Sequence, residues 1–240
     1  MRILVLSDIH SNIVALEAVL ADAGTVDGVW HLGDVVGYGP DPDAVVERLH
    51  GLGAIGVRGN HDSAATGTLD IDDFNADARA AMDWTRRRIG TATRDWLAGL
   101  PLTRVETGLT LVHGSPRDPT WEYVMTTGIA RDNLQAFETP YCLHGHTHVP
   151  IVFREAGRRM EMLAPDDGAT LTLDARRALV NPGSVGQPRD GIPTASYLLL
   201  DPRTGICTWR RVAYDIGAVQ DAMKTAGLPA ALARRLALGL

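Results

Sequence analysis

The sequence has little cysteine, no long apolar run and no excess of positive charge. Its two cysteines, Cys142 and Cys207, lie far apart and outside any CxxC pattern, which predicts reduced core thiols rather than a disulfide framework. The apolar run Ile3–Leu6 is too short for a signal peptide, and no run approaches the roughly 18 residues of a membrane span. These absences predict a cytoplasmic protein with no membrane partner.

The excess of acidic over basic side chains bears on whether the protein binds nucleic acid. The 240 residues include 23 basic and 29 acidic side chains, and the formal net charge of −6 disfavours a long nucleic acid as partner. A hydrophobic content of 45% with 22% charged residues is ordinary for a globular protein. The length fits one domain over residues 1–240, as a monomer or as a homo-oligomer.

Five short apolar runs each end in polar side chains of the kinds that bind metal ions. We expect the runs to be buried strands, with glycines such as Gly33 turning the chain at the strand end. Because strand ends meet at one edge of an open sheet, the polar side chains should converge on one site. The five stretches are Ile3–His10, Val29–Asp34, Ile55–Asp62, Leu109–Gly114 and Cys142–His148.

The segments between these runs indicate an α/β fold. Residues 2–57 alternate strand and helix, with helices beginning near Asn12 and Pro42, which predicts a right-handed β-α-β-α-β unit. Further along the chain we expect a helical insertion over about 73–99, a hairpin over 102–112, short strands between 151 and 212, and a helical tail over 216–240 broken near 227–229.

Seven side chains at the predicted strand ends form a candidate metal site. They are two carboxylates, one amide and four imidazoles: Asp8, Asp34, Asn60, His10, His113, His146 and His148. Mixed oxygen and nitrogen ligands without thiolates suit Mn, Fe, Zn, Co or Ni better than Mg or Ca. Seven ligands are too many for one ion with an open position, but they suffice for two ions that share Asp34, an arrangement used in phosphoester hydrolysis. We therefore expect two divalent ions, with Mn²⁺ favoured.

The order of these motifs resembles the calcineurin-like metallophosphoesterase superfamily. The resemblance covers the whole chain and rests on Asp8/His10, Gly33-Asp34, Gly59–Asp62, His113 and Gly145–His148. Asn181–Val185 resembles a motif of the small bacterial and archaeal phosphodiesterase branch. The resemblance implies a four-layer α/β/β/α sandwich of two mixed β-sheets with flanking helices. It also implies one ion on Asp8, His10, Asp34 and His148, and the other on Asp34, Asn60, His113 and His146.

The same resemblance implies a mechanism. A hydroxide that bridges the two ions would attack phosphorus in line, and His61 would protonate the leaving oxygen or hydrogen-bond the phosphate. Asp62 is a candidate to orient His61. Arg58, Asn12 and Arg189 are candidates for substrate contact, and the expected substrate is a small phosphoester.

One departure from the family's pattern bears on the substrate. Ser/Thr phosphatases of the superfamily carry Asp-Arg three and four residues beyond the bridging aspartate, where this chain has Gly37 and Tyr38. This favours a phosphodiesterase acting on a small diester over a protein phosphatase.

Other functions stay open beside the phosphodiesterase. They are a phosphomonoesterase or nucleotidase, a dinucleoside polyphosphate hydrolase, and a non-catalytic scaffold of the same fold. Scaffolds of that kind lose the histidine after asparagine, which this chain keeps as His61. A further hypothesis is that Trp121, Tyr123 or Tyr38, in predicted cleft loops, stack on a base or an aryl leaving group.

Overall fold

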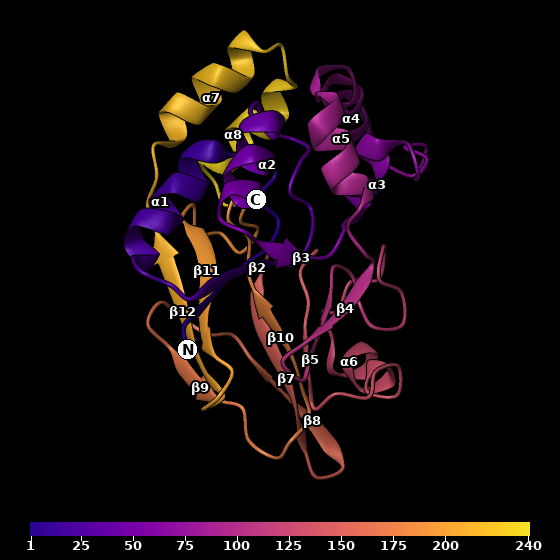
Figure 1. Ribbon diagram of the computed structural model, residues 1–240, viewed down its shortest axis with the longest axis vertical. Helices are drawn as coiled ribbons and strands as arrows, with labels where there is room; N and C mark the ends of the chain where they lie inside the picture. The colour runs from indigo at the N-terminus through magenta and orange to yellow at the C-terminus, as the bar shows by residue number, and fades with distance from the viewer.

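The computed structural model describes residues 1–240 and arranges them as two six-stranded β-sheets with helices on the outer faces (Figure 1). The first sheet has the strand order β3 (Ile55–Gly56), β2 (Gly28–His31), β1 (Ile3–Leu6), β11 (Ala195–Asp201), β12 (Ile206–Val212), β9 (Thr170–Thr172). The second sheet has the order β4 (Thr103–Glu106), β5 (Leu109–Val112), β6 (Tyr141–Leu143), β10 (Ala178–Pro182), β7 (Pro150–Ala156), β8 (Arg159–Leu163). Each sheet contains parallel and antiparallel neighbours, which confirms the predicted fold class.

Three apolar cores separate the four layers of the fold. Neighbouring residues of a strand point to opposite faces. On β1, Leu4 belongs to the core beneath the helices, whereas Ile3 belongs to the core between the two sheets. On β10, Val180 faces the core between the sheets and Leu179 faces a third core shared with the helix at residues 127–133. Strands covered on both faces need nearly continuous apolar sequence, which is why residues 3–6 do not alternate with polar residues.

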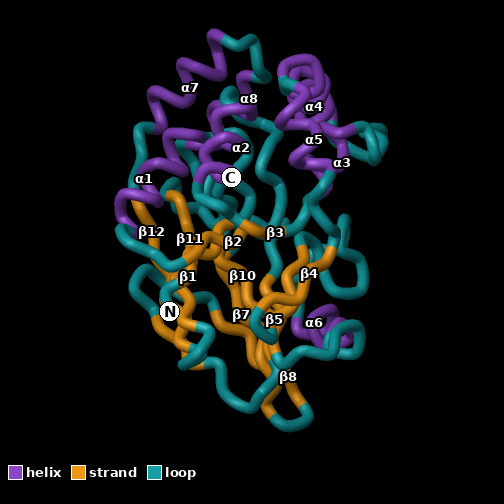
Figure 2. Tube along the Cα trace, viewed as in Figure 1, coloured by secondary structure: helices purple, strands orange, loops and turns teal.

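Helices cover the outer faces of both sheets (Figure 2). Helix α1 (Ile13–Ala23) packs on β11 and β12 of the first sheet, and α6 (Thr127–Asn133) packs on β8 of the second. The remaining helices are α2 (Pro42–Gly51), α3 (Asn60–Thr66), α4 (Ala76–Arg88), α5 (Thr91–Ala98), α7 (Ile216–Thr225) and α8 (Ala230–Leu236). Helix α4, with 13 residues, is the longest, and none of the helices has the length and apolarity that crossing a membrane requires.

The helices agree with the sequence in most places. Helices α4 and α5 lie in the range 73–99 where helices are expected, and α7 and α8 are separated at residues 227–229, as predicted. Helices α3 and α6 are not predicted by the sequence. Each has seven residues, which is too short for the 3.6-residue apolar period to be visible. Asn60–Asp62, expected at a strand end, begin α3 instead.

The turns that carry the candidate ligands come from both sheets. Strands β1, β2 and β3 are parallel neighbours in the first sheet, and β5 and β6 are parallel neighbours in the second. The five ligand-bearing strand ends therefore do not lie in one open sheet as expected: the turns after β1 and β2 meet those after β5 and β6 of the other sheet, in agreement with the predicted pair of sheets. Hydrogen bonds join these turns, for example from the Nδ1 of His113 to the carbonyl of Leu32 at 2.8 Å.

Candidate metal centre

Strained backbone turns carry most of the candidate ligands. Five of the seven have φ between 49° and 67°, the left-handed region that residues other than glycine rarely adopt: Asp8, His10, Asp34, His146 and His148. Each such residue costs on the order of 1–3 kcal/mol, and strain of this kind concentrates at functional sites. Main-chain hydrogen bonds hold these turns, including Asp8 N–H to the carbonyl of Gly33 at 3.1 Å.

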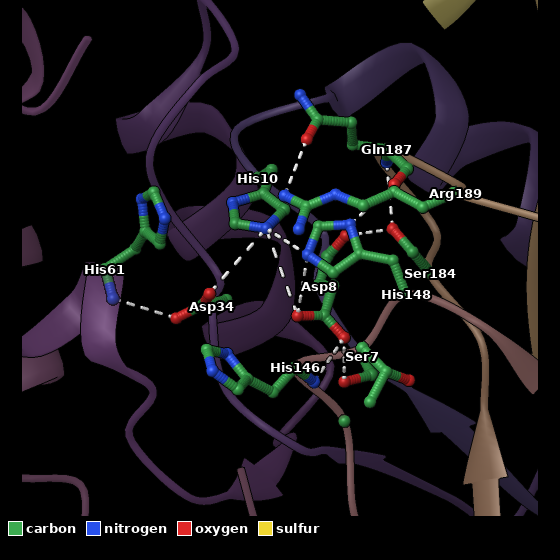
Figure 3. A network of polar contacts seen from close by, with 12 residues as sticks. Ser7, Asp8, His10, Asp34, His61, His146, His148, Ser184, Gln187 and Arg189 are labelled. Carbon is green, nitrogen blue, oxygen red and sulfur yellow. Dashed lines mark hydrogen bonds and ion pairs between the residues drawn. The ribbon is translucent and has the colours of Figure 1, made fainter. Parts of the chain in front are cut away.

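The first of two ligand clusters brings together Asp8, His10, Asp34 and His148 (Figure 3). The Nε2 of His148 lies 3.3 Å from Oδ1 of Asp8 and 3.1 Å from Nε2 of His10. The Nε2 of His10 lies 3.7 Å from Oδ2 of Asp34. All four side chains are buried, so these polar atoms face one another away from bulk water.

The second cluster shares Asp34 with the first and adds His113 and His146. The Nε2 of His113 lies 3.3 Å from Oδ2 of Asp34 and 3.0 Å from Nδ1 of His146. The amide oxygen of Asn60 also lies 3.0 Å from Nε2 of His113. The structure thus brings all seven predicted ligands together in two groups that meet at one carboxylate.

Each carboxylate is oriented by hydrogen bonds to only one of its oxygens. Oδ2 of Asp8 accepts the hydroxyl of Ser7 at 2.6 Å and the N–H of His146 at 3.1 Å, whereas Oδ1 is buried and accepts no hydrogen bond. Oδ1 of Asp34 accepts the N–H of His61 at 2.9 Å, which directs Oδ2 toward the histidines of both clusters. A buried carboxylate oxygen without a partner is costly unless a cation faces it.

Main-chain carbonyls fix the rings of the four histidines. A carbonyl oxygen can only accept, so the ring nitrogen that faces it must carry the hydrogen. The pairs are His10 Nδ1 with Val36 at 3.2 Å, His113 Nδ1 with Leu32 at 2.8 Å, His148 Nδ1 with Gln187 at 2.5 Å, and His146 Nε2 with Trp121 at 3.2 Å. In a neutral ring, the nitrogen that points into the site then has a free lone pair.

The ring nitrogens that point into each cluster are separated by about the distance between two ligands of one metal ion. The facing nitrogens are 3.1 Å apart between His10 and His148, and 3.0 Å apart between His113 and His146. The facing nitrogens of neutral His10 and His148 are both acceptors and cannot hydrogen-bond each other, whereas two atoms each about 2.1 Å from one ion, at roughly a right angle, lie about 3 Å apart. The two clusters fit divalent ions with nitrogen and oxygen ligands, and Asp34 is placed to serve both.

Burial and neighbouring charges set the protonation of the site. Burial lowers the pKa of His146 to about 3 and that of His10 well below its usual value, so both rings are neutral. Burial also opposes charge on His113, but the carboxylates of Asp34 and Asp8 outweigh it and raise the pKa of His113 to about 9. Burial opposes ionisation of Asp34 as well, yet the charge of His113 holds its pKa well below the usual range. A metal ion would displace the proton of His113.

A cavity of about 100 Å³ opens beside the two clusters. On the side of the two clusters, the cavity is lined by Asp34, Asn60, His61, His146 and His148. Its other walls include Tyr38, Phe74, Trp121, Tyr123 and Arg189. Pockets that enclose drug-sized ligands measure about 300–1,000 Å³, so a larger ligand would extend beyond this cavity. The aromatic residues of the predicted cleft loops do lie at this cavity, as expected.

His61 lies in the wall of the cavity with an unused ring nitrogen. Its Nδ1 is buried and has no hydrogen-bond partner, and burial lowers the pKa of the ring to about 4. The ring centroid lies 4.4 Å from that of Tyr38 and 4.9 Å from that of Phe74, so packing fixes its position. A neutral, immobilised imidazole at this place can donate a hydrogen bond to an anion in the cavity.

Gly37 makes room for the imidazole of His61. Its φ is +96°, and a Cβ added there would lie only 3.1 Å from Cγ of His61 and closer still to Nδ1. A side chain at residue 37 would therefore displace the imidazole. The next residue, Tyr38, has its hydroxyl 3.5 Å from Nη2 of Arg189.

The predicted contact between Asp62 and His61 is not formed. The carboxylate of Asp62 accepts the N–H of Val36 at 3.1 Å and that of Gly59 at 3.0 Å. Adjacent side chains on a helix diverge, and these two point in different directions from the start of α3. Burial, and then the charge of Asp34, raise the pKa of Asp62 to about 7. Its observed contacts position the turn that carries Asp34 rather than the imidazole.

Of the three side chains predicted to contact the substrate, two lie away from the cavity and one lines it. Arg58 follows β3 in the loop before α3, where it donates to the carbonyl of Ala98 at 3.2 Å and does not line the cavity. Asn12 caps α1 by accepting the N–H of Ala15 at 3.0 Å, and it donates to the carbonyl of Gly186 at 3.1 Å. Only Arg189 lines the cavity.

The structure also adds residues that the sequence does not single out. Phe74, expected as an ordinary core position, lines the cavity and packs edge-on against Trp121 with ring centroids 5.4 Å apart. Gln187 fixes His148 through its carbonyl oxygen. Nothing in the local sequence marks either residue, because both reach the site through tertiary packing of loops.

Comparison with known proteins gives one family. A family model described as "Calcineurin-like phosphoesterase superfamily domain" matches residues 1–205. The crystal structure of a metallophosphoesterase from Sphaerobacter thermophilus is 48% identical and superimposes with a TM-score of 0.92 over 100% of this chain and 99% of that one.

Two sequence relatives are also similar to this chain. An uncharacterized protein of Methanocaldococcus jannaschii is 36% identical over 244 residues, which cover 99% of this chain and 98% of the relative. A symmetrical bis(5'-nucleosyl)-tetraphosphatase of Nitrosococcus oceani is 32% identical over 150 residues, covering 57% of this chain and 52% of that protein.

Proposed function

The chain belongs to the calcineurin-like phosphoesterase superfamily, and we propose that it hydrolyses small phosphodiesters with two divalent metal ions, for which Mn²⁺ is the favoured metal. In the proposal, one ion binds Asp8, His10, Asp34 and His148, and the other binds Asp34, Asn60, His113 and His146. The supporting observation is the pair of clusters that share Asp34, in which a main-chain carbonyl holds one nitrogen of each imidazole so that the other nitrogen points inward.

The bound ions would withdraw charge from the phosphoryl oxygens and make water acidic enough to act as a nucleophile near neutral pH. The chain's own residues would position the ester. A phosphoryl group in the cavity of about 100 Å³ would lie between the clusters, His61 and Arg189. Arg189 would hold a non-bridging oxygen, because a guanidinium can donate two parallel hydrogen bonds to phosphate.

His61 would assist departure of the leaving group. Burial lowers the pKa of His61 to about 4, so the free imidazole is neutral at pH 7 and can donate a hydrogen bond but has no added proton to transfer. A phosphate anion beside it would raise that pKa, so that the ring would take up a proton from solvent and then, as imidazolium, transfer it to the leaving oxygen. Asp62 would act only by holding the turn of Asp34 in place, through its hydrogen bonds to Val36 and Gly59.

A second candidate is hydrolysis of a nucleotide or a dinucleoside polyphosphate. It is favoured by the partial similarity to the Nitrosococcus oceani tetraphosphatase. The chemistry would be the same, with additional contacts outside the cavity. A non-catalytic scaffold is disfavoured because the chain keeps all seven ligands and His61.

The test is hydrolysis of bis-p-nitrophenyl phosphate and of p-nitrophenyl phosphate by metal-stripped protein, with and without Mn²⁺. We expect Mn²⁺-dependent diester hydrolysis that is lost in Asp34→Asn and reduced about 10²–10⁴-fold in His61→Gln. Arg58→Gln is the matched control, since Arg58 lies outside the cavity. Faster turnover of the monoester would favour a phosphatase, and no turnover with two ions bound would favour the scaffold.

A further inference from the structure

Asn181, near the end of β10, is a buried amide that no step of the proposed reaction uses. Its Oδ1 accepts the N–H of Gly183 at 2.8 Å, and its Nδ2 donates to the carbonyl of Gly145 at 2.8 Å and to Oγ1 of Thr147 at 3.1 Å. A main-chain N–H can only donate and a carbonyl can only accept, so the two ends of the amide are not interchangeable. An aspartate at this position could keep only the bond from Gly183.

The two hydrogen bonds from Nδ2 hold the turn that carries two candidate ligands. Gly145 precedes His146, and Thr147 lies between His146 and His148. The φ values of His146 and His148 are 67° and 60°, so each residue carries backbone strain on the order of 1–3 kcal/mol. Donors that satisfy the carbonyl and the hydroxyl from outside the turn favour this strained conformation over a relaxed one.

The residues that follow Asn181 hold the turn that carries Asp8. The Oγ of Ser184 donates to the main-chain carbonyl of Asp8 at 2.8 Å, and the N–H of Gly186 donates to the same carbonyl at 3.0 Å (Figure 3). One segment therefore joins the turn of Asp8 to the turn of His148, whose Nε2 lies 3.3 Å from Oδ1 of Asp8.

Both sheets fix the main chain at Asn181. Its carbonyl accepts Nε1–H of Trp209, a buried side chain of β12 in the first sheet, at 3.0 Å. In the second sheet, β10 pairs with β6 and β7, and the carbonyl of Val180 accepts the N–H of His144 at 3.0 Å. An amide on such a rigid support can impose a position on the adjacent turn.

We propose that Asn181 is a positioning residue of the metal centre: its amide fixes the turn Gly145–His148 and so places His146 and His148 before any ion binds. The inference rests on the proposed function, because it takes these two imidazoles as metal ligands. It goes further by linking the two ions, since His148 lies in the first cluster and His146 in the second. Loss of the amide should therefore weaken the binding of both ions.

Calorimetric titration of metal-stripped protein with Mn²⁺ tests this role through affinity rather than activity. Asn181→Ala removes the whole amide, whereas Asn181→Asp keeps the acceptor for Gly183 and loses both donors. We expect both variants to bind each ion about 10–100-fold more weakly than wild type, as is typical when a group that orients a metal ligand is removed. Unchanged dissociation constants, or a loss confined to one ion, would overturn the inference.

Ser196→Ala is the matched control. Ser196 is also buried, and its Oγ donates to the carbonyl of Pro182 at 2.7 Å, next to Asn181 but without a bond to the turn Gly145–His148. The variant should therefore lower the unfolding free energy and leave the affinity for Mn²⁺ unchanged. If Ser196→Ala weakened Mn²⁺ binding as much as Asn181→Ala, general loss of stability would explain both effects and the inference would fail.

Thr147→Val provides the test if the Asn181 variants do not fold. It removes the hydroxyl that accepts Nδ2 of Asn181 at 3.1 Å, and with it a contact to the N–H of Val149 at 3.3 Å, from a side chain of nearly the same shape. We expect both ions to bind about 2–10-fold more weakly, the effect of one lost hydrogen bond. Unchanged affinity for both ions would overturn the inference.

Hydrogen exchange of the metal-free proteins separates failure of this inference from failure of the proposed function. If wild type binds no Mn²⁺, the proposed function fails, and exchange in the turn then decides on the positioning role alone. The N–H of Gly145 donates to the carbonyl of His113 at 2.8 Å, and that of His146 to Oδ2 of Asp8 at 3.1 Å. We expect both amides to exchange at least about ten-fold faster in Asn181→Ala than in Ser196→Ala. Equal rates would refute the role of Asn181.

Discussion

Replacing Gly37 by alanine should disable His61 without removing it. The added Cβ would lie 3.1 Å from Cγ of His61 and nearer to Nδ1, so the imidazole must withdraw by about 1 Å to reach an ordinary contact distance. A misplacement of about 1 Å at a reacting group costs on the order of 10²-fold in rate. The φ of +96° adds about 1–3 kcal/mol of backbone strain to the folded state. We therefore expect Gly37→Ala to fold with reduced stability and to lose about 100-fold in kcat.

The assay is hydrolysis of bis-p-nitrophenyl phosphate at saturating Mn²⁺, together with urea unfolding. Gly108→Ala is the control, since Gly108 has a φ of +82° and nothing lies within 4 Å of a Cβ placed there. It should show the loss of stability without the loss of activity. In a His61→Gln background, Gly37→Ala should have little further effect on kcat, because both changes act on one group. Full activity of Gly37→Ala, or losses that multiply in the double variant, would refute the reasoning.

Three further predictions concern stability and protonation. Burial lowers the pKa of His31 to about 3 from its ordinary 6.5, so below about pH 6.5 the unfolded chain takes up a proton that the folded chain does not. When the pH falls from 7 to 5, the unfolding free energy of wild type should therefore drop by about 2 kcal/mol more than that of His31→Phe. Urea unfolding at the two pH values measures both drops, and equal drops would contradict this. Burial lowers the pKa of His113, but Asp34 and Asp8 outweigh it and raise that pKa to about 9. Mn²⁺ binding at pH 7.5 should therefore release about one proton, and His113→Asn should abolish the release. Calorimetry in buffers of different ionisation enthalpy measures the number of protons released. Asn12→Ala should cost about 1–3 kcal/mol in unfolding free energy with an unchanged KM, whereas a raised KM would restore its role in substrate contact.

The positions of the candidate ligands could be predicted because each directly follows a short apolar run. A buried strand that ends at glycine or at a polar residue brings that residue to the edge of its sheet, so Asp8, Asp34 and His113 follow from local sequence alone. Their meeting in two groups around Asp34 also agrees with the structure. The strained φ values show that tertiary contacts, more than local preference, fix the final geometry.

Local sequence could not give the pairing of distant strands or the direction of single side chains. The two sheets are completed by β10 and β11, which lie far along the chain from β6 and β1, their partners. The same limit explains Arg58, because its loop follows β3 and its contact with the carbonyl of Ala98 arises from tertiary packing. Gly239 lies more than 200 positions after Asp8, yet its carbonyl accepts the N–H of Gly191, close in the chain to Arg189 at the cavity.

The central claim is that two metal ions bind at clusters that share Asp34, and counting ions tests it most directly. Metal-stripped protein is dialysed against Mn²⁺, and bound Mn²⁺ per chain is measured by mass spectrometry for wild type, His148→Ala and His113→Ala. Each variant removes a ligand from only one of the two clusters. The account predicts two ions in wild type and one in each variant. A single ion in wild type, or no change in either variant, would contradict it.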